Sequence, residues 1–141
     1  MTYEYLLISA DGASRGNPGR AAIGAVIKDG QGNVVCRVSR AIGIATNNQA
    51  EYRALIAALG EAIRLGARRV DIKIDSELVV KQVSGQYQVK NAGLRPLNVE
   101  VKRLLGSFER FSLSHMSGED NHEAHHLAGL ALRPRLESGG D

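Results

Sequence analysis

The sequence has little of what secreted and membrane-spanning proteins depend on. It contains a single cysteine, Cys36, so no internal disulfide can form, and a reducing compartment fits better than a secreted one. Its longest uncharged apolar stretches are far shorter than the roughly 20 residues that a membrane span requires. The N-terminus also lacks the basic segment and apolar core of a secretory signal. We therefore expect a soluble, cytoplasmic protein with no membrane partner.

Length and charge set further bounds. A chain of 141 residues is long enough to form one domain that buries roughly 68% of the surface exposed by its unfolded form. We expect this domain to span residues 1–132 and to be followed by a polar, flexible tail at residues 133–141. The net charge of +3 is mild and permits an anionic partner such as nucleic acid without requiring one. A monomer is the default expectation.

Three strands are predicted in the first third of the chain. The apolar run at residues 6–8 leads to Asp11, and the dense glycine, asparagine and proline of residues 12–19 predict that this strand stops there. Residues 21–28 and 34–40 have the pattern of two more strands. The short glycine-rich link between them, residues 29–33, is typical of a β-hairpin.

Helical spacing begins after these strands. Thr46 with Gln49 three residues later resembles a capping box, and apolar residues then recur at helical spacing up to Gly66. The pattern next predicts a strand at 70–74, a helix at 76–83, a helix from Pro96 onward, a strand at 108–115 and a helix at 119–132. Strands interrupted by helices, with a hairpin at the front, predict a three-layer α/β domain with a mixed sheet.

Three acids are predicted to converge. Asp11 and Asp75 each follow a strand, and the crevice beyond the carboxyl ends of strands is the usual ligand site of an open α/β sheet. Glu51 lies near the start of the long helix. Like charges about 4 Å apart repel by roughly 4 kcal/mol at an effective dielectric near 20, so converging carboxylates need a cation. Oxygen ligands select magnesium or manganese. Taken singly, each acid is as consistent with merely capping a turn or facing water as it is with binding a metal ion.

Three motifs carry a family resemblance: ADGASRGNPG with Asp11, TNNQAEYRA with Glu51, and DSELVVKQ with Asp75. Together they resemble the ribonuclease H type 1 family, whose members cut the RNA strand of RNA–DNA hybrids, over residues 5 to about 131. The resemblance implies a ribonuclease H-like fold with a five-stranded mixed sheet whose first three strands are antiparallel. It also implies that the three acids hold two divalent ions, Mg²⁺ or Mn²⁺, and that hydrolysis leaves 5′-phosphate and 3′-hydroxyl ends.

The same resemblance implies a substrate surface. Minor-groove contact suits the discrimination between RNA and DNA, because the 2′-hydroxyls are displayed there. Double-stranded RNA remains open as a further substrate. The residues implied to contact the hybrid are Gly12, Ser14, Asn17, Asn47, Asn48 and Glu77.

The last predicted helix departs from the family pattern. Family members carry a fourth acid there, in a pattern like N-x-x-A-D-x-L-A, whereas this chain reads NHEAHHLA from Asn121, with His125 in the place of the aspartate. At 100° per residue, His125 lies at the border of the apolar face, where it can reach the site. We therefore include His125 among the catalytic and metal-binding residues and expect a preference for manganese. The alternative is that His125 is a tolerated surface substitution.

Two other functions compete with a hybrid nuclease. The missing fourth acid is consistent with a non-catalytic module that binds hybrids, although such a module would gain little from three repelling acids. HEAHH, beginning at His122, also matches H-E-x-x-H, the pattern of zinc proteases. However, helical spacing directs His122 and His126 toward solvent, and no third zinc ligand is evident.

Overall fold

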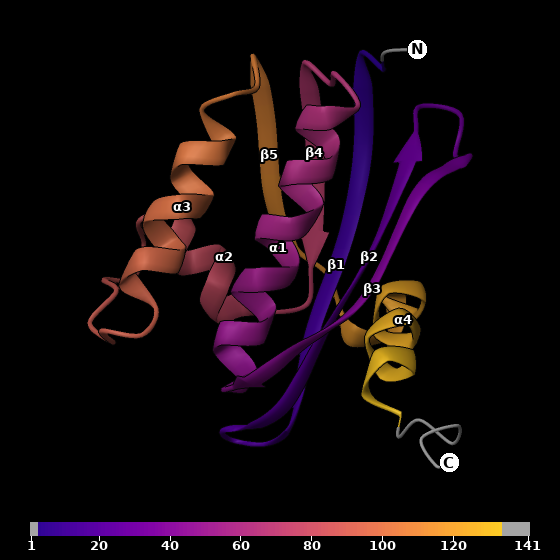
Figure 1. Cartoon of the computed structure of the whole chain (residues 1–141). Helices are drawn as coiled ribbons and strands as arrows, with labels where there is room; N and C mark the ends of the chain where they lie inside the picture. The colour runs from indigo at the N-terminus through magenta and orange to yellow at the C-terminus, as the bar shows by residue number, and fades with distance from the viewer. Residues whose placement is uncertain (1–2, 134–141) are drawn as a thin grey trace.

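The computed structural model describes residues 3–133 and contains one five-stranded sheet in the order β3-β2-β1-β4-β5 (Figure 1). β1, β2 and β3 pair antiparallel, whereas β4 runs parallel to β1 and β5 parallel to β4. The predicted mixed sheet is therefore confirmed. The strands are β1 (Tyr5–Gly16), β2 (Gly19–Asp29), β3 (Val34–Ala45), β4 (Arg69–Ile74) and β5 (Arg110–His115).

Within residues 3–133, four α-helices lie on the two faces of the sheet (Figure 1). They are α1 (Asn47–Arg64), α2 (Glu77–Val83), α3 (Arg95–Leu105) and α4 (His122–Leu132). A Cβ at Gly12 would collide with the main chain of Ala50 in α1, and a Cβ at Gly24 would collide with that of Ala124 in α4. Gly24 pairs with Asp11, the neighbour of Gly12. Because successive strand residues point to opposite faces, α1 and α4 cover opposite faces of the sheet.

The long predicted helix, α1, begins with the capping box that the sequence indicates. The Thr46 hydroxyl accepts a hydrogen bond from the Gln49 main-chain N–H at 3.1 Å, and the Gln49 side chain accepts one from the Thr46 N–H at 2.8 Å. The helix packs against the face of β1 that carries Leu6 and Ile8, both fully buried. Capping and burial together fix where the first turns of α1 lie.

The first strand does not stop at Asp11, contrary to the sequence prediction. Its pairing with β4 ends at Ala10–Ile74, but its pairing with β2 continues to Gly16–Gly19. The glycine-rich stretch is therefore one arm of a long hairpin, and the turn is confined to Asn17 and Pro18, which are joined by a cis peptide bond. Local glycine signals predicted a turn, whereas the hydrogen-bonding partner β2 keeps the backbone extended.

Other boundaries shift by a few residues. β3 runs to Ala45, beyond the predicted end at residue 40, and β5 starts at Arg110 rather than at residue 108. α4 starts at His122 rather than at residue 119, because Gly118–Asp120 forms a 3₁₀ turn, η1. Apart from Arg133, the predicted tail lies outside the described residues. Within residues 3–133, no helix is long and apolar enough to cross a membrane.

A buried polar network joins the helices that flank the acids. The Tyr52 hydroxyl on α1 donates to Oε1 of Gln82 on α2 at 2.7 Å, and Nδ2 of Asn98 on α3 donates to the Tyr52 oxygen at 3.2 Å. All three side chains are buried. Since unpaired buried polar groups are costly, this network fixes the three helices relative to one another.

We expect Gly12→Ala to destabilise the protein by about 2–3 kcal/mol, because the new Cβ would force the α1 main chain away from β1. Urea unfolding measures the change. Gly60→Ala is the matched control: Gly60 lies within α1, is exposed, and has no atom near the position of a Cβ. It should stabilise the protein by about 0.5–1 kcal/mol. Equal unfolding midpoints for the two variants would contradict this packing account.

Candidate active site

The structure brings the three predicted acids together. Asp11, Glu51 and Asp75 each offer a carboxylate oxygen, and these oxygens all lie within 4.8 Å of one another. Ala10–Ile74 is the last pair between β1 and β4, so Asp11 and Asp75 occupy equivalent positions just beyond it. The acids of the two parallel strands are therefore placed side by side.

Glu51 reaches this point because α1 lies directly on the main chain of β1. The missing side chain at Gly12 leaves room for the backbone of α1 at Ala50 and Glu51. Asp11 lies on the face of the sheet that α4 covers, and Glu51 comes from the opposite layer. They meet where the pairing of β1 with β4 has ended, so a side chain on one face of the sheet and a helix on the other face contribute to one site.

The carboxyl groups of Asp11 and Glu51 resist ionisation. Burial, followed by the charges of Asp75 and Asp11, raises the pKa of Glu51 to about 7. Burial and the charge of Asp75 raise the pKa of Asp11 to about 6, although the hydrogen bond with His125 opposes this rise. A cation among the acids would relieve both the repulsion and part of the burial cost. Because all the donors are carboxylate oxygens, the site fits a hard divalent ion such as Mg²⁺ or Mn²⁺.

His125 contacts this cluster from α4. Its Nδ1 lies 2.9 Å from Oδ2 of Asp11, and its side chain is 73% exposed while that of Asp11 is 6% exposed. With the proton on Nδ1, the imidazole donates to Asp11 and keeps a lone pair on Nε2. The structure thus places the His125 side chain beside Asp11, and its role as a metal ligand stays a prediction.

The residues predicted to contact a nucleic acid fall into three places. Gly12 is buried beneath α1, and the Ser14 hydroxyl donates to the main-chain oxygen of Gly16 at 2.6 Å. Asn17, in the hairpin turn, accepts a hydrogen bond from the Asn47 main-chain N–H at 3.1 Å. The hairpin turn is thereby joined to the start of α1, where Asn48 follows Asn47. Glu77 is exposed at the first position of α2. Their contacts with a nucleic acid stay predictions.

The HEAHH motif forms no comparable cluster. His122 and His126 are both exposed on α4, as helical spacing predicts. Within residues 3–133, Asp11, Glu51 and Asp75 are the one group of three or more acid, histidine or cysteine side chains close enough to hold a metal ion. The geometry therefore gives no support to a zinc protease.

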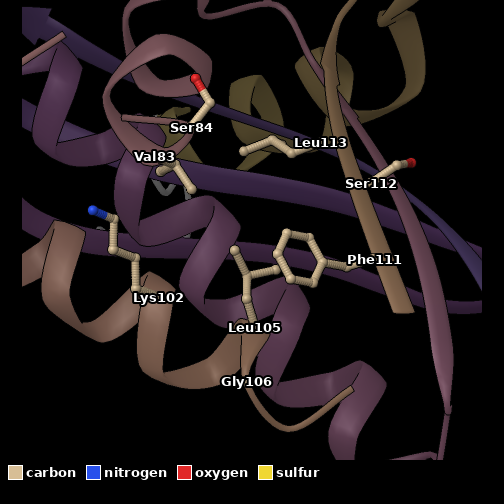
Figure 2. Close-up of a pocket in the computed structure, with 8 residues that line it drawn as sticks. All are labelled: Val83, Ser84, Lys102, Leu105, Gly106, Phe111, Ser112 and Leu113. Carbon is tan, nitrogen blue, oxygen red and sulfur yellow. The ribbon is translucent and has the colours of Figure 1, made fainter. Parts of the chain in front are cut away.

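A cavity of about 500 Å³ lies elsewhere, between α2, α3 and β5 (Figure 2). Leu105 of α3 and Phe111 and Leu113 of β5 turn into it (Figure 2). Its lining is mostly apolar and includes no carboxylate, and Lys102 is its one charged residue. It therefore lacks the groups that make the acid cluster a candidate for catalysis.

Two further residues lie near the acids, and the sequence alone did not predict a role for either of them. Gly118 lies in the turn before α4, where a Cβ would stand 3.6 Å from Oδ2 of Asp75, so this turn passes beside the acids. Asn121 is 1% exposed and its side chain donates to the main-chain oxygen of Ala10. The position of Asn121 at the start of a motif was visible in the sequence, but its partner, which lies near the other end of the chain, was not.

The raised pKa of Glu51 predicts a pH-dependent stability in the absence of divalent ions. Glu51 binds its proton more tightly in the folded protein, so its stabilising contribution is complete below its ordinary pKa of 4.5 and is lost as the pH rises through about 7. Glu51→Gln should therefore be more stable than the wild type at pH 8, by about 1–2 kcal/mol after allowance for solvent screening, with the difference shrinking toward pH 5.

Urea unfolding in EDTA at the two pH values provides the test. Glu100→Gln is the control with the opposite sign, because the hydrogen bond from Arg103 lowers the pKa of Glu100. Glu100→Gln should therefore reduce the free energy of unfolding at pH 8. A Glu51→Gln protein that is less stable than the wild type at pH 8 would contradict the electrostatic account.

Comparisons with known proteins agree with this geometry. Residues 9–131 match the family model described as "Reverse transcriptase-like". Ribonuclease HI of Halobacterium salinarum is 45% identical over 122 residues, which is 86% of this chain and 61% of that protein. The chain also spans 37% of the bifunctional protein Rv2228c of Mycobacterium tuberculosis, at 42% identity. It is therefore shorter than both of these curated relatives.

Solved structures extend the match to three dimensions. The crystal structure of RNase H1 from Halobacterium salinarum superposes with a TM-score of 0.89 at 43% identity, covering 91% of this chain and 97% of that one. LC11-RNase H1 in complex with an RNA/DNA hybrid gives a TM-score of 0.85 at 36% identity, covering 90% of this chain and 96% of that one. Because it matches these RNase H1 structures at 36–43% identity over nearly their whole length, the chain belongs to the ribonuclease H family.

Proposed function

We propose that this protein is a metal-dependent endoribonuclease that hydrolyses the RNA strand of RNA–DNA hybrids and leaves 5′-phosphate and 3′-hydroxyl ends. The observation that carries the proposal is the convergence of Asp11, Glu51 and Asp75 within 4.8 Å on a ribonuclease H fold. The similar LC11-RNase H1 has been solved with an RNA/DNA hybrid bound, which supports the same substrate class here.

Asp11, Glu51 and Asp75 are the residues that would hold the metal. In a two-metal mechanism, bound divalent ions supply an activated water nucleophile and stabilise the leaving 3′ oxygen. The protein contributes fixed geometry and negative charge, and no covalent enzyme intermediate is involved. Because the pKa values of Asp11 and Glu51 are raised to about 6 and 7, protons compete with metal ions for this site below neutral pH.

His125 orients the most buried of the acids. The contact of its Nδ1 with Oδ2 of Asp11 would hold this carboxylate in one orientation, and the carboxylate would still be able to bind a metal ion. The exposed imidazole of His125 would offer its Nε2 lone pair as a nitrogen ligand at the sequence position where family members have a carboxylate. Neutral imidazole is a better ligand for manganese than for magnesium, so the proposal includes a preference for Mn²⁺.

In this proposal, the hybrid binds to the surface formed by the β1–β2 hairpin turn and the start of α1, which are joined by a hydrogen bond. Asn17 and Asn47 are linked at 3.1 Å, and Glu51 lies one helical turn beyond Asn47. Side-chain and main-chain amides at this point would face the hybrid backbone and the minor groove, where 2′-hydroxyls distinguish RNA from DNA. Activity on double-stranded RNA is a separate outcome of the same assay.

We expect Asp11→Asn to abolish cleavage of a labelled RNA–DNA hybrid in Mg²⁺ or Mn²⁺, because the amide keeps the shape of the carboxylate but loses its charge. Asp29→Asn makes the same change at the last residue of β2, whose carboxylate accepts hydrogen bonds from the main-chain N–H groups of Gln31 and Asn33 in the following turn, and should retain wild-type activity. Gel analysis of the products also reports the end groups. Hybrid binding by the wild type without cleavage in either metal would instead support the non-catalytic module.

The imidazole of His125 beside the acids leads us to expect a preference for Mn²⁺ over Mg²⁺. The wild type should cleave faster in Mn²⁺ than in Mg²⁺, and His125→Asp should reduce this ratio by raising the rate in Mg²⁺. His122→Asp adds the same charge to the same helix at an exposed position and should leave the ratio unchanged. Equal wild-type rates in the two metals, together with no effect of His125→Asp, would show that His125 is a tolerated surface substitution.

A further inference from the structure

We propose that Asn121 is a positioning residue that holds the start of α4 against β1, so that His125 stays in contact with Asp11. Its expected effect on cleavage rests on the proposed function, whereas its effect on the His125–Asp11 contact does not.

The side chain of Asn121 is bonded to the backbone that carries Asp11. Asn121 is 1% exposed, and its Nδ2 donates to the main-chain oxygen of Ala10 at 3.0 Å. Ala10 immediately precedes Asp11 and is the last residue of β1 that pairs with β4. The hydrogen bond therefore fixes α4 at the position on β1 where the acid cluster begins.

The main chain of Asn121 is bonded to His125. Its carbonyl oxygen accepts the His125 N–H at 3.1 Å, in the first turn of α4. One residue thus bonds to Ala10 through its side chain and to His125 through its main chain. The His125 side chain is 73% exposed, so little packing restrains the ring. Its 2.9 Å contact with Asp11 depends on where the first turn of α4 is held.

The side chain of Asn121 is oriented by its donor group. Its Oδ1 is buried and has no hydrogen-bond partner among the described residues, whereas its Nδ2 donates to the main-chain oxygen of Ala10. The bond to Ala10 is therefore the side-chain hydrogen bond on which the position of Asn121 depends.

Other bonds hold the rest of α4 on the sheet. The Ser39 hydroxyl donates to the main-chain oxygen of Leu127 at 2.6 Å, and the Arg20 guanidinium donates to that of Leu132 at 2.7 Å. With these bonds and the packing of α4 over Gly24 intact, loss of the Asn121 side chain should loosen the first turn without detaching the helix. The variant is thus expected to fold.

The first experiment measures the contact itself in the metal-free protein. NMR signals of the His125 ring are assigned by their disappearance in His125→Ala, and the Asp11→Ala protein gives their position when the contact is absent. We expect Asn121→Ala to move these signals toward the Asp11→Ala position. Arg20→Gln, which removes a bond at the other end of α4, should leave them in place. Unchanged His125 signals in folded Asn121→Ala would overturn the proposal.

The second experiment is a double-mutant cycle on hybrid cleavage. We expect Asn121→Ala to lower kcat by about 10–100-fold with little change in KM, as for residues that orient groups at a metal site. In the His125→Ala background, the same substitution should cost less than about 2-fold, because its effect passes through His125. An equal loss in both backgrounds would show a purely structural role. Should Asn121→Ala unfold, Asn121→Ser serves in the same measurements.

The two experiments separate the possible failures. If the wild type does not cleave hybrids, the proposed function is wrong, and the NMR comparison still decides whether Asn121 positions His125. If the wild type cleaves and the His125 signals do not respond to Asn121→Ala, the positioning role is wrong and the proposed function stands.

Discussion

The repulsion among three carboxylates is the constraint around which this structure is arranged. Asp11, Glu51 and Asp75 lie within 4.8 Å of one another, and the pKa values of two of them are raised to about 6 and 7. A protein selected only for stability would separate such groups, since their proximity reduces the free energy of unfolding at neutral pH. Their convergence indicates a site that is completed by cations.

The fold holds these acids by main-chain packing and by bonds between distant segments. Two acids follow the last pair of two parallel strands, and the third is brought close because Gly12 allows α1 to lie on the backbone of β1. The Tyr52 network prevents α1 and α2 from separating, and α4 approaches from the other face with His125. The side chains of the site come from β1, α1, the end of β4 and α4, so the site exists only in the assembled fold.

Much of this arrangement could be predicted from local sequence. Asp75 follows a compact strand, Thr46 and Gln49 start α1 where a capping box indicates, and helical spacing placed His125 at the border of the apolar face of its helix. Predictions from local sequence were wrong or missing where the structure depends on a partner that is distant in the chain. Residues 12–16 have the composition of a loop, yet pairing with β2 keeps them extended. No role could be predicted for Asn121, because its hydrogen-bond partner, Ala10, is 111 positions away in the sequence.

Calorimetric titration of Mn²⁺ into the metal-free protein, repeated in buffers of different ionisation enthalpy, tests the central claim most directly, because it counts the protons released on binding. Raised pKa values at Asp11 and Glu51 predict that binding near pH 6 releases protons, that the release disappears near pH 8.5, and that Glu51→Gln reduces it. Absence of Mn²⁺ binding, or binding with the same proton release at both pH values, would contradict the account.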